Sequence, residues 1–570
     1  MNRSLKITLA ALLALVAFGG VTWCRADRTR TSDATNRGRI TASIRSEPAG
    51  YNRYLTSTAA GDLLSRLTDG RLIVLNRSTD EVEPALAERW TQSADGLSYT
   101  LSLRRDVRFS DGEPFTSADV LFSARVLYDP DVASPLGASS LIEGKPLAFS
   151  APDPWTVTVT LPSPFAPGIR LLENLPILPR HKLEAALNEK RLREAWRVGS
   201  PLSEIAVLGP FVLKEHVTGQ RLVFERNPHY WRRDASGTPL PHLEGITIFV
   251  VPDQNTEALR QRSGEIDLMV NGDIRPEDYA GFKAAADQGR LVLHDAGIAT
   301  DTNFLWFNLS AAARERLAWL HDPRVRQAIS YAVNRQAIVD TVYLGAAVPI
   351  YGPVSPANRA WFSPTAPQYP HDRQKATALL GAAGLVDRNG DRMLEDTRGR
   401  PVRFSILTNT GNTLRERTAS LIQAHLKEVG IAVDLVTIEQ RAMGENIRTG
   451  EYDAVYHATQ ASSLDPALNL AFWSSDGSFH IWNPNQATPA TPWEAEIDSL
   501  MDRQAAASSQ SERQRLFAEA QRIIGEQLPV IYFVAPRVTI AVSPRVRNVT
   551  PVAQPPHVLW NAEMLAVDRK

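Results

Sequence analysis

The chain has only one cysteine among its 570 residues, Cys24. A disulfide within one chain is therefore excluded, and the fold must be held together by packed cores. At about 100 to 200 residues per domain, this length predicts roughly three compact units. The apolar content of 43% and the charged content of 22% are typical of an ordinary globular protein.

An excess of charge of either sign is also missing. Lysine and arginine number 62, and aspartate and glutamate number 63. The composition therefore has no excess of basic residues of the kind that favours nucleic-acid binding. The patterns HExxH, GxSxG, GxxxxGK and GxGxxG are absent, and the 11 histidines are scattered without the spacing of zinc ligands. We therefore expect no catalytic centre, no metal and no cofactor.

Long apolar runs are missing except for one, from Ile7 to Phe18, which only Thr8 interrupts. Arg3 and Lys6 precede it, which is the layout of an export signal. The run is shorter than the ~20 residues that span a bilayer comfortably. We therefore expect the folded part to be periplasmic or otherwise extracytoplasmic.

Cys24 lies just behind this run, where a bacterial lipoprotein carries its acylated residue. Trp23 is far bulkier than the small residue that normally precedes such a cysteine. The alternatives are cleavage after Ala26, which removes the thiol, and an uncleaved anchor. In each case residues 1–26 form the leader and residues 27–38, which are polar and without periodicity, form a tether.

Residues 86–128 predict a strand, a turn and a capped helix. An Asp-Gly pair at 95–96 favours a turn because glycine tolerates positive φ, and apolar residues alternate with polar ones over 99–103, as in a half-buried strand. Thr116 can cap a helix, with Asp119 completing a capping box. The pattern indicates regular structure on both sides of the turn.

A second informative stretch begins at residue 402. Residues 402–406 predict a strand, residues 414–428 a helix and residues 431–435 another strand. A strand, helix, strand unit favours parallel pairing through a right-handed crossover. The second half of the chain is therefore expected to be of the α/β class.

Four stretches resemble one known family. Residues 86–128, 209–231, 322–345 and 526–534 are similar, in the same order, to motifs of the peptide/nickel-type (family 5) extracellular solute-binding proteins, which serve ATP-binding-cassette (ABC) importers. The resemblance covers roughly residues 40–550. It implies an α/β fold with the two lobes of a periplasmic-binding protein, the Venus-flytrap fold, and an extra subdomain in the first lobe.

The resemblance also implies the domain boundaries. They are residues 39–300 plus 529–570 for lobe 1, about 80–205 for its inserted subdomain, and 301–528 for lobe 2. The chain would cross between the lobes near Asp301 and again near Leu528, and these crossings would serve as a hinge.

The resemblance implies a function in solute binding and transport rather than in catalysis. A member binds a solute between its lobes and delivers it to the permease subunits of an ABC importer, and an oligopeptide or peptide-like molecule is the default ligand. We expect a monomer that contacts no nucleic acid. An extracytoplasmic hydrolase and a ligand sensor without a transport role remain the alternatives.

One departure from the family concerns the ligand. Many peptide receptors of this type have an aspartate three residues before an Asp-Pro pair, and it binds the α-ammonium group of the ligand. Here the pair begins at Asp465, and the matching residue is Ser462. A neutral hydroxyl provides no charge-assisted hydrogen bond to a cationic amine. His457, Thr459 and Gln460 lie on the same strand and loop, and with Ser462 and Asp465 they are candidate ligand contacts.

Four further residues are candidates for ligand contact. Tyr51 and Asn52 occupy the position of the family's turn beside the cleft, and Trp473 and Trp482 could stack on a ligand. The alternative is that the first two are plain turn residues and that the tryptophans are core.

A metal-like pattern occurs once. Asp387, Asn389 and Asp391 hold alternate ligand positions of an EF-hand loop, but Arg392 replaces the glycine at its sixth position and Arg398 the glutamate at its twelfth. We interpret the stretch as a solvated turn without metal.

Overall fold

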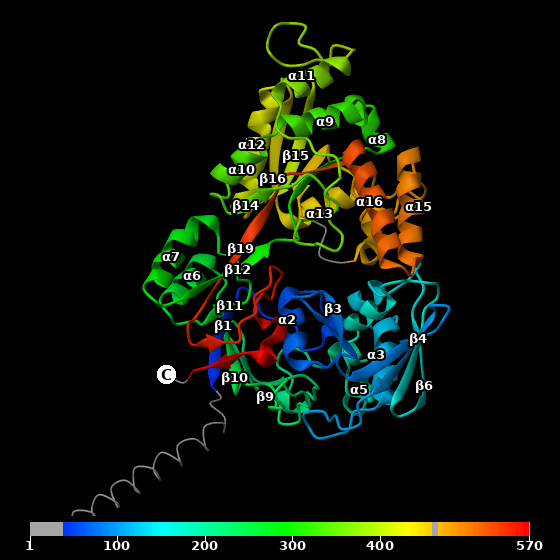
Figure 1. The fold of residues 1–570 in the computed structure, drawn as a ribbon, viewed down its shortest axis with the longest axis vertical. Helices are drawn as coiled ribbons and strands as arrows, with labels where there is room; N and C mark the ends of the chain where they lie inside the picture. The colour runs from blue at the N-terminus through cyan, green and yellow to red at the C-terminus, as the bar shows by residue number, and fades with distance from the viewer. Residues whose placement is uncertain (1–37, 273, 459–464, 569–570) are drawn as a thin grey trace, which may run out of the picture.

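The structure is a computed structural model that describes residues 38–568, except Asp273 and residues 459–464. It has two lobes, one above the other in Figure 1, and each is built around its own sheet. None of the helices in the described ranges combines the length and the apolar character that a membrane crossing requires.

The sheet of lobe 1 is mixed and has eight strands. Along it the strands follow the order β12-β19-β11-β1-β10-β9-β8, and β14 pairs with β19. The bounds are β1 Arg39–Ile44, β8 Phe211–Val217, β9 Arg221–Arg226, β10 Gly245–Val250, β11 Leu268–Met269, β12 Val292–Ile298, β14 Ala347–Pro349 and β19 Val534–Val542. Helices α2 (Ala59–Thr68), α6 (Gln254–Arg262) and α7 (Tyr279–Asp287) and the hairpin β2 (Ile73–Asn76) and β3 (Glu81–Pro84) also belong to this lobe.

The subdomain of lobe 1 contains a separate antiparallel sheet in the order β4-β5-β7-β6. Its strands are β4 Ala87–Gln92, β5 Ser98–Leu103, β6 Ala148–Asp153 and β7 Thr156–Thr160, and its helices are α3 Ser117–Tyr128, α4 Pro135–Ala138 and α5 Arg180–Asn188. The predicted capping box is confirmed at the start of α3, where Thr116 accepts from the backbone and Asp119 accepts from the Thr116 backbone.

The sheet of lobe 2 has five strands in the order β16-β15-β17-β13-β18. They are β13 Phe304–Phe307, β15 Arg403–Asn409, β16 Ala432–Ile438, β17 Ala454–His457 and β18 Val530–Tyr532. β15 and β16 are parallel and are joined by α12 (Thr413–Lys427), which confirms the predicted strand, helix, strand unit.

Helices cover both faces of this sheet. They are α8 Ala311–Arg314, α9 Pro323–Ala332, α10 Arg335–Thr341, α11 Arg373–Ala382, α13 Gln440–Thr449, α14 Leu470–Trp473, α15 Pro492–Ala506 and α16 Gln510–Gln527. Strand β13 shows why two cores form, because Leu305 and Phe307 pack into one and Phe304 and Trp306 into the other. Such alternation is the two-residue period of a strand that is buried on both faces.

The chain passes between the lobes at two short crossings, and beside the second one the edge strand β14, which lies between α10 and α11 in sequence, pairs with the first residues of β19. The first runs from the end of β12 in the lobe 1 sheet to the start of β13 in the lobe 2 sheet, over residues 299–303. The second is Phe533 alone, between β18 and β19. The sequence placed it near Leu528, but β18 pairs with β13 and so belongs to lobe 2. Because the residues of this segment are all apolar, the sequence does not show at which residue the chain leaves one sheet and enters the next.

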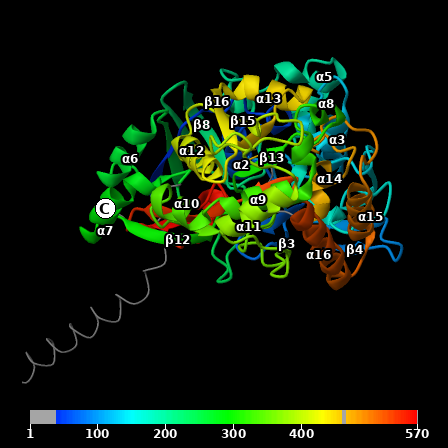
Figure 2. The same ribbon diagram turned by 90° about the horizontal axis from the view of Figure 1, so that it is seen from above.

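A third contact joins the lobes at the end opposite the hinge. The Ala166 amide of the subdomain donates to the Ala505 carbonyl at the end of α15, at 2.7 Å. Ala505 and Ala467 of lobe 2 share a hydrophobic cluster with Phe165 of lobe 1. In the view from above, β4 of the subdomain and helices α15 and α16 accordingly lie at the same end of the molecule (Figure 2).

Candidate functional site

A polar cluster lies near the first crossing, where two strands of lobe 2 end and a third begins. Asn409 is the last residue of β15, His457 is the last residue of β17, and Asn303 directly precedes β13. Arg415 is in the first turn of α12, and Gln440 begins α13. Figure 1 shows α13 at the edge of the upper lobe that is turned toward lobe 1. We call these five residues the Arg415 cluster.

Arg415 is the charged member of this cluster, and only 8% of its surface is exposed. Its Nε donates to Oδ1 of Asn303 at 2.9 Å, and its Nη1 donates to Oδ1 of Asn409. In the part of the chain that the structure describes, no carboxylate forms an ion pair with Arg415, and Nη2 has no hydrogen-bond partner. Burial lowers the pKa of this guanidinium, which nevertheless stays charged at neutral pH.

A buried cation that has only neutral partners and unused hydrogen-bond donors is suited to bind an anion. Transfer of a charge out of water costs free energy unless an opposite charge or enough hydrogen bonds compensate it. Among the described residues, Arg415 has two amide oxygens as hydrogen-bond partners and one nitrogen without a partner. A carboxylate at Nη2 would supply the missing charge through a strong, charge-assisted hydrogen bond.

His457 keeps this part of the cluster neutral. Its Nδ1 lies 2.8 Å from the Ala458 carbonyl oxygen, and its Nε2 lies 3.2 Å from Oε1 of Gln440. Burial, and then the charge of Arg415, lower the pKa of His457 to about 4. The imidazole is therefore uncharged at neutral pH, so Arg415 alone provides the positive charge here.

On lobe 1, Tyr51 and Asn52 are buried and fixed by hydrogen bonds. The Tyr51 hydroxyl lies 2.8 Å from Nδ1 of His216, and Nε2 of His216 lies 3.1 Å from Oε2 of Glu47. The Asn52 side chain accepts from the Tyr54 amide and caps a 3-10 turn. A cavity of about 370 Å³ adjoins Asn52. The structure therefore places both residues in a rigid turn, and ligand contact by them stays a prediction.

Three other candidates belong to the core of lobe 2. Trp473 is 1% exposed and packs edge to face against Phe472 and Phe517, while Trp482 is fully buried and its Nε1 donates to Glu494. Asp465 is buried in an ion pair with Arg513 (Nη1 to Oδ2, 2.7 Å). These contacts place the three side chains in the packed interior of lobe 2, and ligand contact by them stays a prediction. The sequence could not reveal this because an indole that packs in a core looks the same as one that stacks on a ligand.

The remaining candidates, Thr459, Gln460 and Ser462, lie outside the described residues. His457 is the one member of the predicted set that the Arg415 cluster contains. The sequence does contain a signal for Arg415, because a basic residue in the first turn of a helix opposes the helix dipole and is unfavourable there without another role.

The acidic side chains of the metal-like turn accept hydrogen bonds from its own backbone. Ligand oxygens of Asp387, Asp391 and Glu395 lie within 4.8 Å of one another. However, Asp387 accepts from the amides of Gly390 and Arg392, and Glu395 accepts from the amide of Arg388. These bonds explain the acidic spacing as turn geometry.

Comparison with known proteins gives consistent results. The model of the bacterial extracellular solute-binding proteins, family 5, matches residues 81–480. A probable ABC transporter-binding protein of Deinococcus radiodurans is 26% identical over 513 residues, which is 86% of each chain. The nickel-binding periplasmic protein of Escherichia coli is 28% identical over 479 residues, covering 83% of this chain and 82% of that protein. The oligopeptide-binding protein AppA of Bacillus subtilis, solved with a nonapeptide, has a TM-score of 0.70 and 24% identity over 94% of this chain and 100% of that one, and it shares the fold.

Proposed function

Because the chain belongs to the bacterial extracellular solute-binding proteins of family 5, we propose that it captures an oligopeptide or peptide-like solute by the solute's carboxylate at Arg415. The observation that carries this proposal is a buried guanidinium whose partners in the described ranges are neutral and whose Nη2 has no hydrogen-bond partner there. Relatives named for oligopeptides and dipeptides support the peptide class, whereas the nickel- and heme-binding relatives show how widely ligands vary.

Capture would work by closure of the two lobes. The two crossings form a narrow hinge, and a ligand that touches both lobes favours the closed arrangement by its differential affinity. A change from 1% to 99% closed requires about 5.5 kcal/mol. One charge-assisted hydrogen bond at Arg415 would supply about 1.5–3 kcal/mol of this, and further contacts would supply the rest.

Family 5 members are transport binding proteins rather than enzymes, and we propose the same for this chain. The closed receptor would present its solute to a membrane permease and would leave the solute chemically unchanged. Incubation with a peptide panel should therefore return every peptide intact; turnover would favour the hydrolase alternative.

Location outside the cytoplasmic membrane follows from the family, and the form of the amino terminus is a further proposal. Leader removal after Ala26 and acylation at Cys24 predict mature proteins of clearly different mass. Intact-mass measurement of the exported protein distinguishes them, and native mass spectrometry of the same sample tests the expected monomer and detects a ligand retained through purification.

The decisive experiment compares peptides that differ only at their ends. Calorimetric titration of a tripeptide panel should give binding that falls roughly 10- to 100-fold when the terminal carboxylate is amidated. Acetylation of the amine should change affinity little, because Ser462 replaces the aspartate that holds the amine in related receptors. Equal binding of free and amidated peptides would refute a carboxylate anchor.

A further inference from the structure

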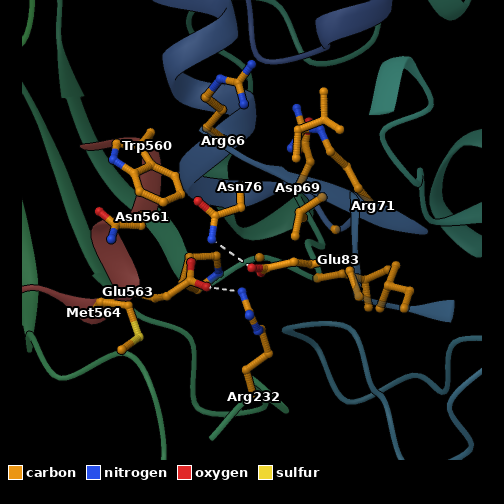
Figure 3. A pocket seen from close by; sticks show the side chains of 18 of the residues that line it. Arg66, Asp69, Arg71, Asn76, Glu83, Arg232, Trp560, Asn561, Glu563 and Met564 are labelled. Carbon is orange, nitrogen blue, oxygen red and sulfur yellow. Dashed lines mark hydrogen bonds and ion pairs between the residues drawn. The ribbon is translucent and has the colours of Figure 1, made fainter. Parts of the chain in front are cut away.

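A second pocket, of about 410 Å³, lies entirely within lobe 1 (Figure 3). Its walls come from the end of α2, the β2–β3 hairpin, the segment after β9 and the segment around the 3-10 helix η8 (Leu559–Met564). No residue of the Arg415 cluster lines it. The volume is in the range of sites that hold small molecules, about 300–1,000 Å³.

The arginines that line this pocket are already neutralised. Arg66 pairs with Asp62 at 2.7 Å and with Glu173 at 3.4 Å. Arg232 pairs with Glu563, as the dashed line in Figure 3 shows. Neither arginine is therefore available as an unpaired cation that would attract an anionic ligand.

Arg71 and Asp69 offset each other. Burial raises the pKa of Asp69, and the charge of Arg71 opposes that shift. The Arg71 side chain donates to Ser65 and to the Glu173 carbonyl oxygen. These two residues therefore add no net charge to the pocket at neutral pH.

Glu83 differs from these groups, because it lines the pocket without a cationic partner at ion-pair distance among the described residues. Its Oε1 accepts from Nδ2 of Asn76 at 2.7 Å, and its Oε2 has no hydrogen-bond partner there. In Figure 3 the carboxylate of Glu83 points toward the same central space as that of Glu563. The pocket therefore has a local excess of negative charge.

Three aromatic side chains, Tyr230, Trp231 and Trp560, form further parts of the wall. One face of Trp231 already binds a cation, since the Arg104 guanidinium lies 4.3 Å from its ring centroid. Nε1 of Trp560 donates to the Thr550 carbonyl oxygen at 2.8 Å, which fixes the orientation of that ring. Aromatic faces beside a carboxylate are the chemistry that recognises alkylammonium groups.

We propose that this lobe 1 pocket is a second ligand site, separate from the cleft, and that it binds a small organic ammonium ion. The ammonium group lies against Oε2 of Glu83 and the indole of Trp560. Alkyl groups of the ion contact the aromatic wall. The site is independent of the carboxylate-binding function assigned to Arg415.

Choline is the probe for this proposal, and 3,3-dimethylbutan-1-ol is its neutral isostere. Calorimetric titration of the full mature protein should show saturable binding of choline and at least tenfold weaker binding of the isostere. Binding of both compounds with equal affinity would overturn the proposal. So would the absence of saturable choline binding up to about 10 mM, where a ligand of millimolar Kd would fill most sites.

Variants locate the site. Glu83→Gln and Trp560→Leu should each weaken choline binding at least tenfold, whereas Glu113→Gln, which changes an exposed glutamate of the subdomain, should leave it unchanged. Circular dichroism melting checks that each variant is folded, and the comparison of choline with its isostere needs no variant. Arg415→Gln should keep full choline binding, so failure of the cleft proposal and failure of this one are distinguishable. Unchanged choline binding by folded Glu83→Gln would refute the site.

Discussion

Two buried arginines of lobe 2, Arg335 and Arg415, have similar exposure but differ in how many of their guanidinium nitrogens donate hydrogen bonds. Arg335 is 3% exposed and Arg415 is 8% exposed, and neither has a carboxylate partner in the described part of the chain. Every guanidinium nitrogen of Arg335 donates to a carbonyl or hydroxyl oxygen, at 2.8–3.1 Å. Arg415 has two amide oxygens as partners, and its Nη2 has none within the described ranges. The two side chains therefore differ in open hydrogen-bonding capacity rather than in burial, and this is the property on which the proposed binding role of Arg415 depends.

Location explains the difference. Arg335 fastens the second crossing, because it binds the Tyr532 carbonyl directly before Phe533 and the Ile350 carbonyl beyond β14. Its charge also lies 4.5 Å from the ring centroid of Tyr351. Arg415 lies at the carboxyl edge of the sheet, where parallel strands end and ligands of α/β folds commonly bind.

The largest effect is expected for Arg335→Met. The substitution leaves several buried carbonyl oxygens without donors, so the free energy of unfolding should fall by roughly 3–5 kcal/mol. Urea unfolding measures this loss. Arg373→Met, at an exposed arginine on α11, is the matched control and should change it by less than about 0.5 kcal/mol. A loss no greater than that of the control would mean that Arg335 does not fasten the crossing.

Arg415→Gln should show the reverse behaviour. We expect ligand affinity to fall roughly 10- to 100-fold through loss of the charge-assisted bond, and the free energy of unfolding to change by less than about 1 kcal/mol. Calorimetric titration and urea unfolding of the same preparation test both parts. If stability falls as far as in Arg335→Met while affinity is kept, Arg415 is structural too.

An intermediate effect is expected from acid. The pKa values of His457 and His321 are lowered to about 4, mainly by burial, whereas an unfolded histidine titrates near 6.5. Between these values the unfolded chain binds more protons, so the stability contribution is complete above about pH 6.5 and is lost as the pH falls toward 4. After allowance for partial exposure, His457→Gln should remove about 1–2 kcal/mol of this acid sensitivity. Urea midpoints measured at several pH values test this, and an unchanged pH dependence would contradict it.

The smallest effect is expected at the metal-like turn, where backbone amides bind the carboxylates as carbonyl oxygens bind Arg335. Because backbone amides occupy Asp387 and Glu395, chelation with EDTA should shift the melting temperature by no more than about 1 °C. Asp391→Asn should behave like the unaltered protein in the same assay. An increase of the melting temperature by several degrees on addition of calcium would show a metal site. It would also contradict the idea that side chains already hydrogen-bonded within the protein bind no ligand.

Local structure was predicted well where a single element carries its own signal. The capping box at Thr116 and the parallel unit around α12 depend on residues within a few turns of one another, and both are confirmed. The second crossing was misplaced by a few residues because one apolar run, residues 530–535, contains β18, Phe533 and the start of β19. Of the predicted ligand contacts, His457 lies in the Arg415 cluster, whereas Trp473 and Trp482 are core.

The sequence by itself determined the turns, the caps, the strand and helix periods and, through the order of its motifs, the family. These properties depend on neighbours along the chain, where side-chain spacing fixes which face of an element is apolar. Only the tertiary structure decided which polar side chains meet, since Arg415 and Asn303 are 112 residues apart and come into contact because β13 and β15 belong to one sheet. It also decided which charges keep open hydrogen-bonding capacity, because saturation is set by the groups that packing brings around each of them.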